Sequence, residues 1–209
     1  MWMNRGTSKR ALWKPLGDLS NPNIVAANCM VSRQALYLWL YLATGKFIVM
    51  EQPVGSLLEY HPRMAEIKKV FPIYRVTISM GGFGAASAKP TWLYSGHEFI
   101  QEIKHWEGCA TYNGPAVEVV SRVVSPNTGK IMIMGGKDLK ATQAYPPAFG
   151  KALAELYLAH RSDIRDQAKK LRDRASMVTI TKESLLPVLK GKKAWHDAKL
   201  KGVWERLTT

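Results

Sequence analysis

The stretch Lys46–Pro53 constrains the fold most, because four apolar residues there lead directly into polar ones. An apolar run of this length is typical of a buried strand, and here it ends at Glu51, Gln52 and Pro53. We therefore predict a strand over 46–50 with Glu51 at its carboxyl end. Ligands of open α/β sheets bind beyond the carboxyl ends of the strands, so Glu51 is the first candidate for a functional residue.

The composition indicates a globular protein with a polyanionic partner. A chain of 209 residues with 46% hydrophobic and 10% aromatic residues can bury one core and carry an extension. Its 30 basic and 16 acidic residues give a net charge of +14, which makes nucleic acid the leading candidate for a partner. No segment combines a large apolar face with a lysine face, so we expect no membrane partner.

Cysteine and histidine usage indicates a reducing compartment without a metal site. Cys29 and Cys109 have no CxxC partner, so we expect two buried, reduced thiols. The five histidines lack the spacing of metal ligands. The first residues contain no apolar signal segment, and the longest apolar run, 35–43, is about half of a membrane span. We expect an intracellular protein, nuclear or cytoplasmic, that is not secreted.

The order of the expected elements follows from periodicity and from glycine and proline positions. The segment 81–88 is rich in glycine but lacks the spacing of a nucleotide loop, so we interpret it as a bend between strands. The sequence predicts an irregular basic loop over 1–23, helices over 24–44, 57–70 (capped by Ser56) and 149–174, an antiparallel strand pair over 73–80 and 89–95, an irregular stretch over 96–116, and a hairpin over 117–125 and 130–134.

Four short motifs follow one another along the chain: Glu51-Gln52-Pro53, Phe83-Gly84, Lys89-Pro90-Thr91 and Tyr145-Pro146-Pro147-Ala148-Phe149-Gly150. In order and spacing they resemble the C-terminal part of the catalytic domain of DNA cytosine-5 methyltransferases. The resemblance is strongest to divergent members in which Glu-Asn-Pro or Glu-Gln-Pro replaces Glu-Asn-Val. It covers roughly residues 24–158.

The resemblance implies an α/β fold with a partial Rossmann-like sheet, as in S-adenosylmethionine-dependent methyltransferases. An antiparallel hairpin would belong to the sheet, and a basic helical extension would follow it. The implied divisions are a basic irregular loop over 1–23, a methyltransferase-like half-domain over 24–160, and a basic, mainly helical tail over 161–209. Residues 160–209 hold thirteen Lys or Arg and six Asp or Glu, which is half of the net charge.

The resemblance also implies a role for each matched residue. Methylation of cytosine carbon 5 requires a thiolate on carbon 6 and an acid near N3. Glu51 would be the catalytic residue that holds the N3 and amino edge of a flipped cytosine. The implied substrate-binding residues are Gln52, Pro53, Lys89 and Thr91, and Tyr145 and Pro146 would close the side of the S-adenosylmethionine cofactor.

Two essential parts of such an enzyme are missing from the sequence. The nucleophile should be a cysteine directly after proline, but Cys29 follows Asn28 and Cys109 follows Gly108. Residues 1–23 contain no glycine-rich loop with an acidic ribose ligand. We therefore predict a fragment or inactive relative of these enzymes. The alternatives are a non-catalytic nucleic-acid-binding protein and a purely structural protein.

A half-sheet of this kind would leave the strand over 46–50 without a neighbour on one side. Its free backbone donors and acceptors would need a partner chain, the N-terminal loop, or self-association.

Overall fold

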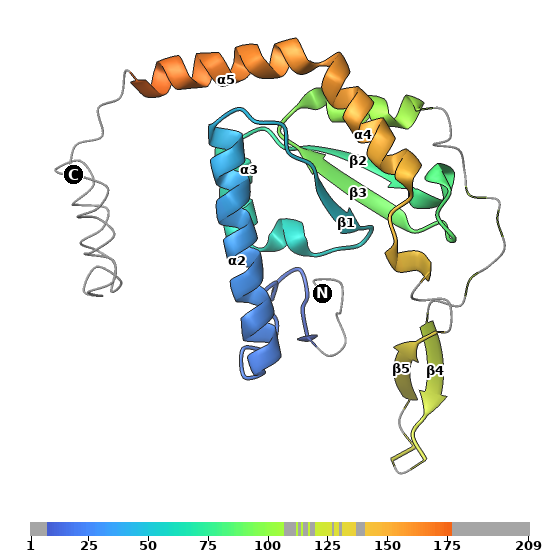
Figure 1. Cartoon of the computed structure of the whole chain (residues 1–209). Helices are drawn as coiled ribbons and strands as arrows, with labels where there is room; N and C mark the ends of the chain where they lie inside the picture. Colours follow the sequence, from blue (N-terminus) through green and yellow to red (C-terminus); the bar gives the residue numbers. More distant parts are fainter. Residues whose placement is uncertain are drawn as a thin grey trace, which may run out of the picture. The chain divides into compact units, whose positions relative to one another are not determined.

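The computed structural model describes residues 8–106, 112, 114, 117, 120–126, 128–129, 131–136 and 141–176 (Figure 1). Contacts divide the chain into two units, Met1–Ala168 and Lys169–Thr209. The fold described below belongs to the first unit, except for residues 169–176 at the end of the last described helix. Within the described ranges, no helix is both long and apolar enough to cross a membrane.

Helix α2 spans Pro22–Ala43 and confirms the helix expected over 24–44. Its N-cap is Asn21, whose side-chain oxygen accepts a hydrogen bond from the backbone nitrogen of Asn23 at 3.0 Å. One side of the helix is buried at helical spacing by Ala27, Asn28, Val31, Ala35, Leu38 and Leu42.

The central sheet contains β1 (Met50–Pro53), β2 (Tyr74–Ser79) and β3 (Pro90–Ser95) in the order β1-β3-β2. Both neighbouring pairs are antiparallel, which confirms the hairpin expected for β2 and β3. The short 3-10 helix η2 (Met80–Phe83) makes the bend, and Gly84 ends it with a φ of +92° that favours glycine.

The architecture is mixed α/β, but the described strands show no Rossmann topology. A Rossmann sheet places parallel strands side by side, whereas β3 lies here between two strands that both run opposite to it. β1 and β2 are therefore parallel to each other without touching, and α3 (Pro62–Val70) joins them along the chain. This is a split β-α-β arrangement.

The strand expected over 46–50 begins later than predicted. β3 pairs with this segment only from Met50 onward, so Glu51 is the second residue of β1 and does not follow its end. The preceding residues still alternate between the faces of the sheet. Phe47 and Val49 pack against one hydrophobic core, and Ile48 and Met50 pack against the other.

Two cores therefore cover the two faces of the sheet. In Figure 1, α2 and α3 lie on one side of the strands, and α4 (Pro147–Ala159) lies on the other. The α4 side also contains the 3-10 helix η3 (Glu98–His105), within the stretch expected to be irregular. The core on the α4 side includes Val76, Leu93, Ile100, Ile103 and Phe149, and the core on the α2 side includes Val31, Leu38, Leu57, Met64 and Ile67.

The helix expected over 57–70 is divided into two elements. Leu57 takes the N-cap position of the 3-10 turn η1 (Leu58–Tyr60) without a side-chain cap, although the hydroxyl of Ser56 accepts from the backbone nitrogen of Leu58 at 3.2 Å. His61 caps α3 instead, since its Nδ1 accepts from the backbone nitrogen of Arg63 at 3.2 Å.

The helix expected over 149–174 is also divided. α4 ends at Ala159, and α5 spans Arg161–Ser176 after a break at His160. The predicted hairpin is present as β4 (Val120–Val124) and β5 (Ile131–Gly135), which pair antiparallel. The 3-10 turn η4 (Ala141–Gln143) precedes α4.

Further expectations concern the chain ends, the domain boundaries and the cysteines. Residues 1–7 of the expected basic loop and residues 177–209 of the expected helical tail lie outside the described ranges. The predicted domain boundaries at 23 and 160 remain predictions. Cys29 was expected to be buried but is exposed on α2, because it lies on the side of the helix that faces away from the core. Cys109 lies outside the described residues, so its expected burial stays a prediction.

Candidate functional site

Glu51 lies on the α4 face of the sheet. In the β1–β3 register it stands opposite Leu93, which belongs to the core on the α4 side, and directly opposed residues share a face. Its Oε2 accepts a hydrogen bond from the phenolic hydroxyl of Tyr145 at 2.8 Å. Tyr145 lies two residues before α4. The start of this helix therefore delivers a donor to the carboxylate.

The second carboxylate oxygen of Glu51 is free to accept a hydrogen bond from a ligand. Oε1 is buried and has no hydrogen-bond partner within the described ranges. A buried acceptor without a donor is unfavourable, and a ligand that brings an N–H or O–H group would relieve this cost.

Lys89 approaches the same place from the start of β3. Its Nζ lies 4.3 Å from the centre of the Tyr145 ring, within the range of a cation–π interaction. The backbone of Lys89 has a φ of +32°, which is rare for a residue with a side chain. The hydroxyl of Thr91 donates to the backbone oxygen of Lys89 at 2.8 Å and helps to hold this conformation.

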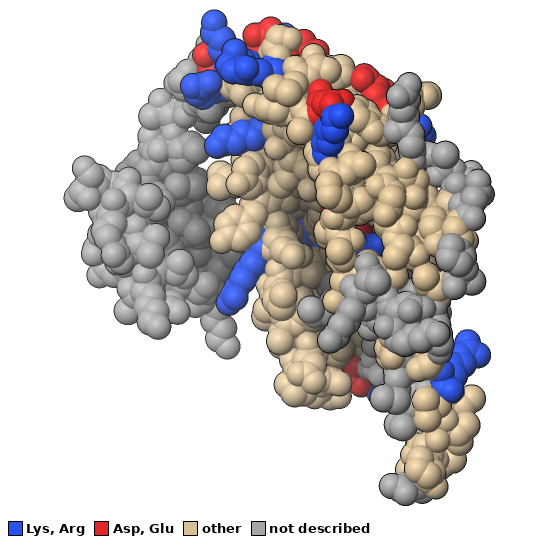
Figure 2. Space-filling model, turned by 45° about the vertical axis from the view of Figure 1, so that its right-hand side comes forward, with Lys and Arg blue, Asp and Glu red and all other residues tan. Residues whose placement is uncertain are grey.

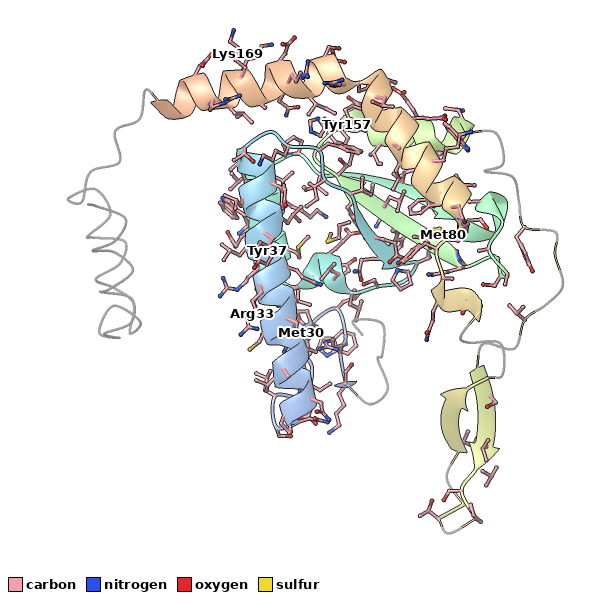
Figure 3. The ribbon with its side chains drawn as sticks, in the orientation of Figure 1. Met30, Arg33, Tyr37, Met80, Tyr157 and Lys169 are labelled. Atoms are coloured by element: carbon pink, nitrogen blue, oxygen red, sulfur yellow. The ribbon has the colours of Figure 1, made fainter. Side chains whose placement is uncertain are left out.

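The aromatic residues of the matched motifs complete the cluster. The rings of Tyr145 and Phe149 have centres 6.0 Å apart, and the rings of Phe149 and Phe83 have centres 5.6 Å apart. Met80 of η2, labelled in Figure 3, is completely buried in the same core. All four motifs thus contribute to one continuous group of side chains.

The pKa of Tyr145 is raised to about 12. Burial is the largest cause, and the hydrogen bond to Glu51 and its negative charge add to it. The phenol therefore remains protonated at neutral pH and remains a donor to Glu51.

Within the described ranges, three predicted site residues make no hydrogen bond to the carboxylate of Glu51. Gln52 points to the opposite face, as successive strand residues do, and its Oε1 accepts from the hydroxyl of Ser56 at 3.0 Å. Pro53 pairs with Thr91, which is fully buried. Binding roles for Gln52, Pro53 and Thr91 remain predictions.

The residues expected on the cofactor side offer little for S-adenosylmethionine. The hydroxyl of Tyr145 is engaged by Glu51, and Lys89 stands over its ring. Pro146 is buried and serves as the N-cap of α4. Within the described ranges no glycine-rich loop links a strand to a helix, so these residues do not fit the cofactor on their own.

A second polar cluster escaped sequence reasoning. Glu59 accepts from the hydroxyl of Tyr94 at 2.7 Å, pairs with Lys68 at 3.0 Å, and pairs with Arg75. Burial would raise the pKa of Glu59, but these partners hold it below its ordinary value. The cluster joins η1, α3 and two strands, so its members are too far apart in sequence to form a motif.

A hollow of about 640 Å³ lies elsewhere in the first unit. Its lining includes His97, Phe99 and His160, together with Glu98, Glu102 and Asp163. Glu51 does not line this hollow. Among the described residues no group of three or more His, Cys, Asp or Glu side chains could hold a metal ion.

Comparison with known proteins identifies no relative: no protein-family profile, no curated protein and no solved structure matches this chain.

Proposed function

We propose that this chain is a cytosine-5 methyltransferase-like protein that binds a nucleic-acid base at Glu51 and does not methylate alone. The observation that carries the proposal is the buried Oε1 of Glu51, which has no partner among the described residues. The amino group of cytosine and its protonated N3 are donors suited to a carboxylate. A base that is flipped out of its stack could present both to Glu51.

The convergence of the matched motifs supports the proposal. Glu51, Lys89 and Tyr145 come from three separate motifs and lie in contact, with Phe83 and Phe149 beside them. The fold supports the proposal only in its coarse arrangement: helices cover both faces of a sheet in which β1 and β2 are parallel, whereas β3 runs antiparallel between them. S-adenosylmethionine remains the cofactor that the resemblance implies.

The lack of a Pro-Cys nucleophile supports the proposal that the chain does not methylate alone. No proline in the chain is followed by cysteine. Cys29 is exposed on α2, and α2 packs on the face of the sheet opposite to Glu51. Cys109 does not follow proline either, and it lies outside the described residues. Activation of carbon 5 for methyl transfer needs a thiolate at carbon 6, and Cys29, the cysteine that the structure describes, does not supply it.

Base recognition can be tested by fluorescence anisotropy with two DNA duplexes. One carries a mispaired cytosine, and the other carries an abasic site at the same position. We expect the full chain to prefer the cytosine duplex by roughly 10- to 100-fold, since a hydrogen bond to a charged group contributes about 1.5–3 kcal/mol. Glu51→Gln should remove the preference. Glu66→Gln, which removes an exposed charge on α3, is the matched control and should keep it.

Equal behaviour of Glu51→Gln and Glu66→Gln would refute base binding at Glu51. The proposal that the chain does not methylate alone has a separate test, which is a methyl-transfer assay on cytosine DNA with the chain alone. Methylation that disappears in Glu51→Gln would show that the chain is an active enzyme.

A second candidate function is nucleic-acid binding through basic side chains without base recognition. α5 contains six basic and three acidic residues. Figure 2 shows Lys and Arg side chains next to acidic ones at the top of the view, and a few scattered charged side chains on the surface below. Binding of this kind would fall steeply with salt and would not distinguish the two duplexes. Either function would place the protein in the nucleus or the cytoplasm.

A further inference from the structure

The hollow of about 640 Å³ is formed by three stretches of the first unit. Pro72 and Tyr74 lie at the start of β2, residues 96–102 lead from β3 into η3, and residues 160–167 include the break between α4 and α5. Its volume lies within the range of sites for small ligands, about 300–1,000 Å³. Since all of these residues belong to Met1–Ala168, the hollow lies within a single unit.

The lining of the hollow is acidic, although the chain as a whole is strongly basic. Glu98, Glu102 and Asp163 contribute carboxylates, and no described lysine or arginine lines the hollow. His160 lies between two of them, with its Nε2 2.8 Å from Glu102 and its Nδ1 3.6 Å from Asp163. Three carboxylates against one histidine leave the lining negative even when His160 is protonated. The hollow therefore attracts a cation and repels a phosphate.

A buried side chain adds an unused hydrogen-bond acceptor. His97 lines the hollow and is 7% exposed. Burial lowers the pKa of His97, so its ring is neutral at neutral pH and has one donor and one acceptor nitrogen. The donor is used by a hydrogen bond to the backbone of Lys46. The acceptor nitrogen has no partner within the described ranges, so it can accept a hydrogen bond from a ligand in the hollow.

Stacked rings fix the position of these groups. The rings of His97 and Phe99 have centres 5.0 Å apart, and Phe99 is almost parallel to His160, with centres 4.2 Å apart. Phe47 packs on Phe99 as well, with ring centres 5.3 Å apart. The acceptor of His97 and the two carboxylates beside His160 are thus held in place before a ligand arrives, which lowers the cost of binding.

The spacing of the carboxylates selects the kind of cation. Among the described residues no three His, Cys, Asp or Glu side chains lie close enough together to hold one metal ion. A single inorganic ion would leave at least one carboxylate without a partner, and it has no N–H group for His97. A ligand with several ammonium groups along a flexible chain can reach separate carboxylates and also donate hydrogen bonds.

We propose that this hollow binds an aliphatic polyamine, whose ammonium groups pair with the three carboxylates and donate one hydrogen bond to the free ring nitrogen of His97. Pairing with the exposed carboxylates weakens as salt is added, whereas the hydrogen bond to the buried His97 is screened much less. The inference is independent of base binding, because Glu51 does not line the hollow.

The test is isothermal titration calorimetry of the full chain with spermidine at low salt. Glu98→Gln combined with Asp163→Asn should weaken binding by roughly tenfold, because two charged acceptors are lost. Glu66→Gln combined with Glu155→Gln is the matched control, since it removes the same charge from exposed positions outside the hollow. It should change the affinity by less than about twofold.

A further variant tests the acceptor. His97→Phe keeps an aromatic ring beside Phe99 and removes the ring nitrogen, so it should weaken spermidine binding by roughly tenfold at low and at high salt. Circular dichroism checks that each variant is folded.

Three results would overturn the proposal. The first is equal affinity of the two double variants for spermidine, or a folded His97→Phe variant that binds it like the wild type. The second is binding of magnesium chloride as tight as that of spermidine, which would mean unspecific attraction of cations. The third is tighter binding of a trilysine peptide than of spermidine, which would assign the hollow to lysine side chains of another protein.

Discussion

The phenolic oxygen of Tyr145 lies 2.8 Å from Oε2 of Glu51, although 94 residues separate them in the chain. The contact ties β1 to the start of α4 and leaves the other carboxylate oxygen without a partner in the described ranges. The carboxylate is thus fixed by one donor and open to a second. Oε1 can therefore accept a hydrogen bond from a ligand while Tyr145 holds Oε2 in place.

The first prediction concerns the titration of Tyr145. We expect the difference in ultraviolet absorbance between wild type and Tyr145→Phe to show one phenol with a pKa of about 12, above the ordinary value near 10. In Glu51→Gln this pKa should fall, because the negative charge is gone and the amide oxygen that replaces the carboxylate is a weaker acceptor.

The raised pKa of Tyr145 also determines how the free energy of unfolding changes with pH. The folded state holds the proton of Tyr145 more tightly than the unfolded state does. The stabilisation that this proton gives is complete below pH 10 and is lost between pH 10 and 12. A Tyr145 pKa that is unchanged by Glu51→Gln would contradict the hydrogen bond.

The second prediction separates the ring of Tyr145 from its hydroxyl. Lys89 lies over the ring, so Tyr145→Phe keeps the cation–π interaction and Tyr145→Leu removes it. In double-mutant cycles with Lys89→Met, urea unfolding should give a coupling of about 0.5–1 kcal/mol for Tyr145→Leu and almost none for Tyr145→Phe. Equal coupling energies in both cycles would mean that Lys89 interacts with the hydroxyl of Tyr145 and not with its ring.

Local periodicity predicted much of the fold. The helical spacing of apolar residues marked α2, and the alternation around a glycine-rich bend marked the antiparallel pair β2 and β3. It failed at His160, where the apolar spacing runs on through a break between α4 and α5. The break coincides with the packing of His160 on Phe99, with ring centres 4.2 Å apart, which is a contact far along the chain.

The candidate site was only partly predictable. Glu51, Lys89 and Tyr145 were singled out from their motifs, but no sequence pattern gave the distances that bring them together. The grouping of Gln52 with Glu51 conflicted with the period of two in a strand, which already placed their side chains on opposite faces. Position along a strand thus selects the face, and packing of distant elements selects the neighbours.

The third prediction concerns His160. The hydrogen bond from its Nε2 to Glu102, at 2.8 Å, is the main cause that raises the pKa of His160, and Asp163 adds to it. We expect nuclear magnetic resonance to give a pKa above 6.5 that falls in Glu102→Gln. Glu98→Gln, on the same 3-10 helix, is the control and should change it little.

The raised pKa gives this pair a defined pH window. The folded state binds the proton of His160 more tightly, so the stabilisation is complete below pH 6.5 and is lost as the pH rises through the folded pKa. A wild-type chain whose stability does not change relative to Glu102→Gln across this window would show that the pair does not form.

The fourth prediction concerns the buried side chain of Arg10, which the sequence placed in an irregular basic loop. Arg10 is only 3% exposed, and burial lowers its pKa. Its Nη2 donates to Oδ1 of Asn28 at 3.0 Å, and Nδ2 of Asn28 donates to the backbone oxygen of Leu16 at 2.9 Å. Asn28 therefore holds the N-terminal loop against α2 through two hydrogen bonds.

Asn28→Ala should lower the free energy of unfolding by about 1–3 kcal/mol, because a buried charged donor loses an acceptor. Gln34→Ala removes a similar amide from the exposed side of the same helix and should change stability by less than about 0.5 kcal/mol. Urea unfolding of the three proteins measures the difference. Equal midpoints for the two variants would mean that Asn28 does not anchor Arg10, and that the loop is held to α2 by its remaining contacts.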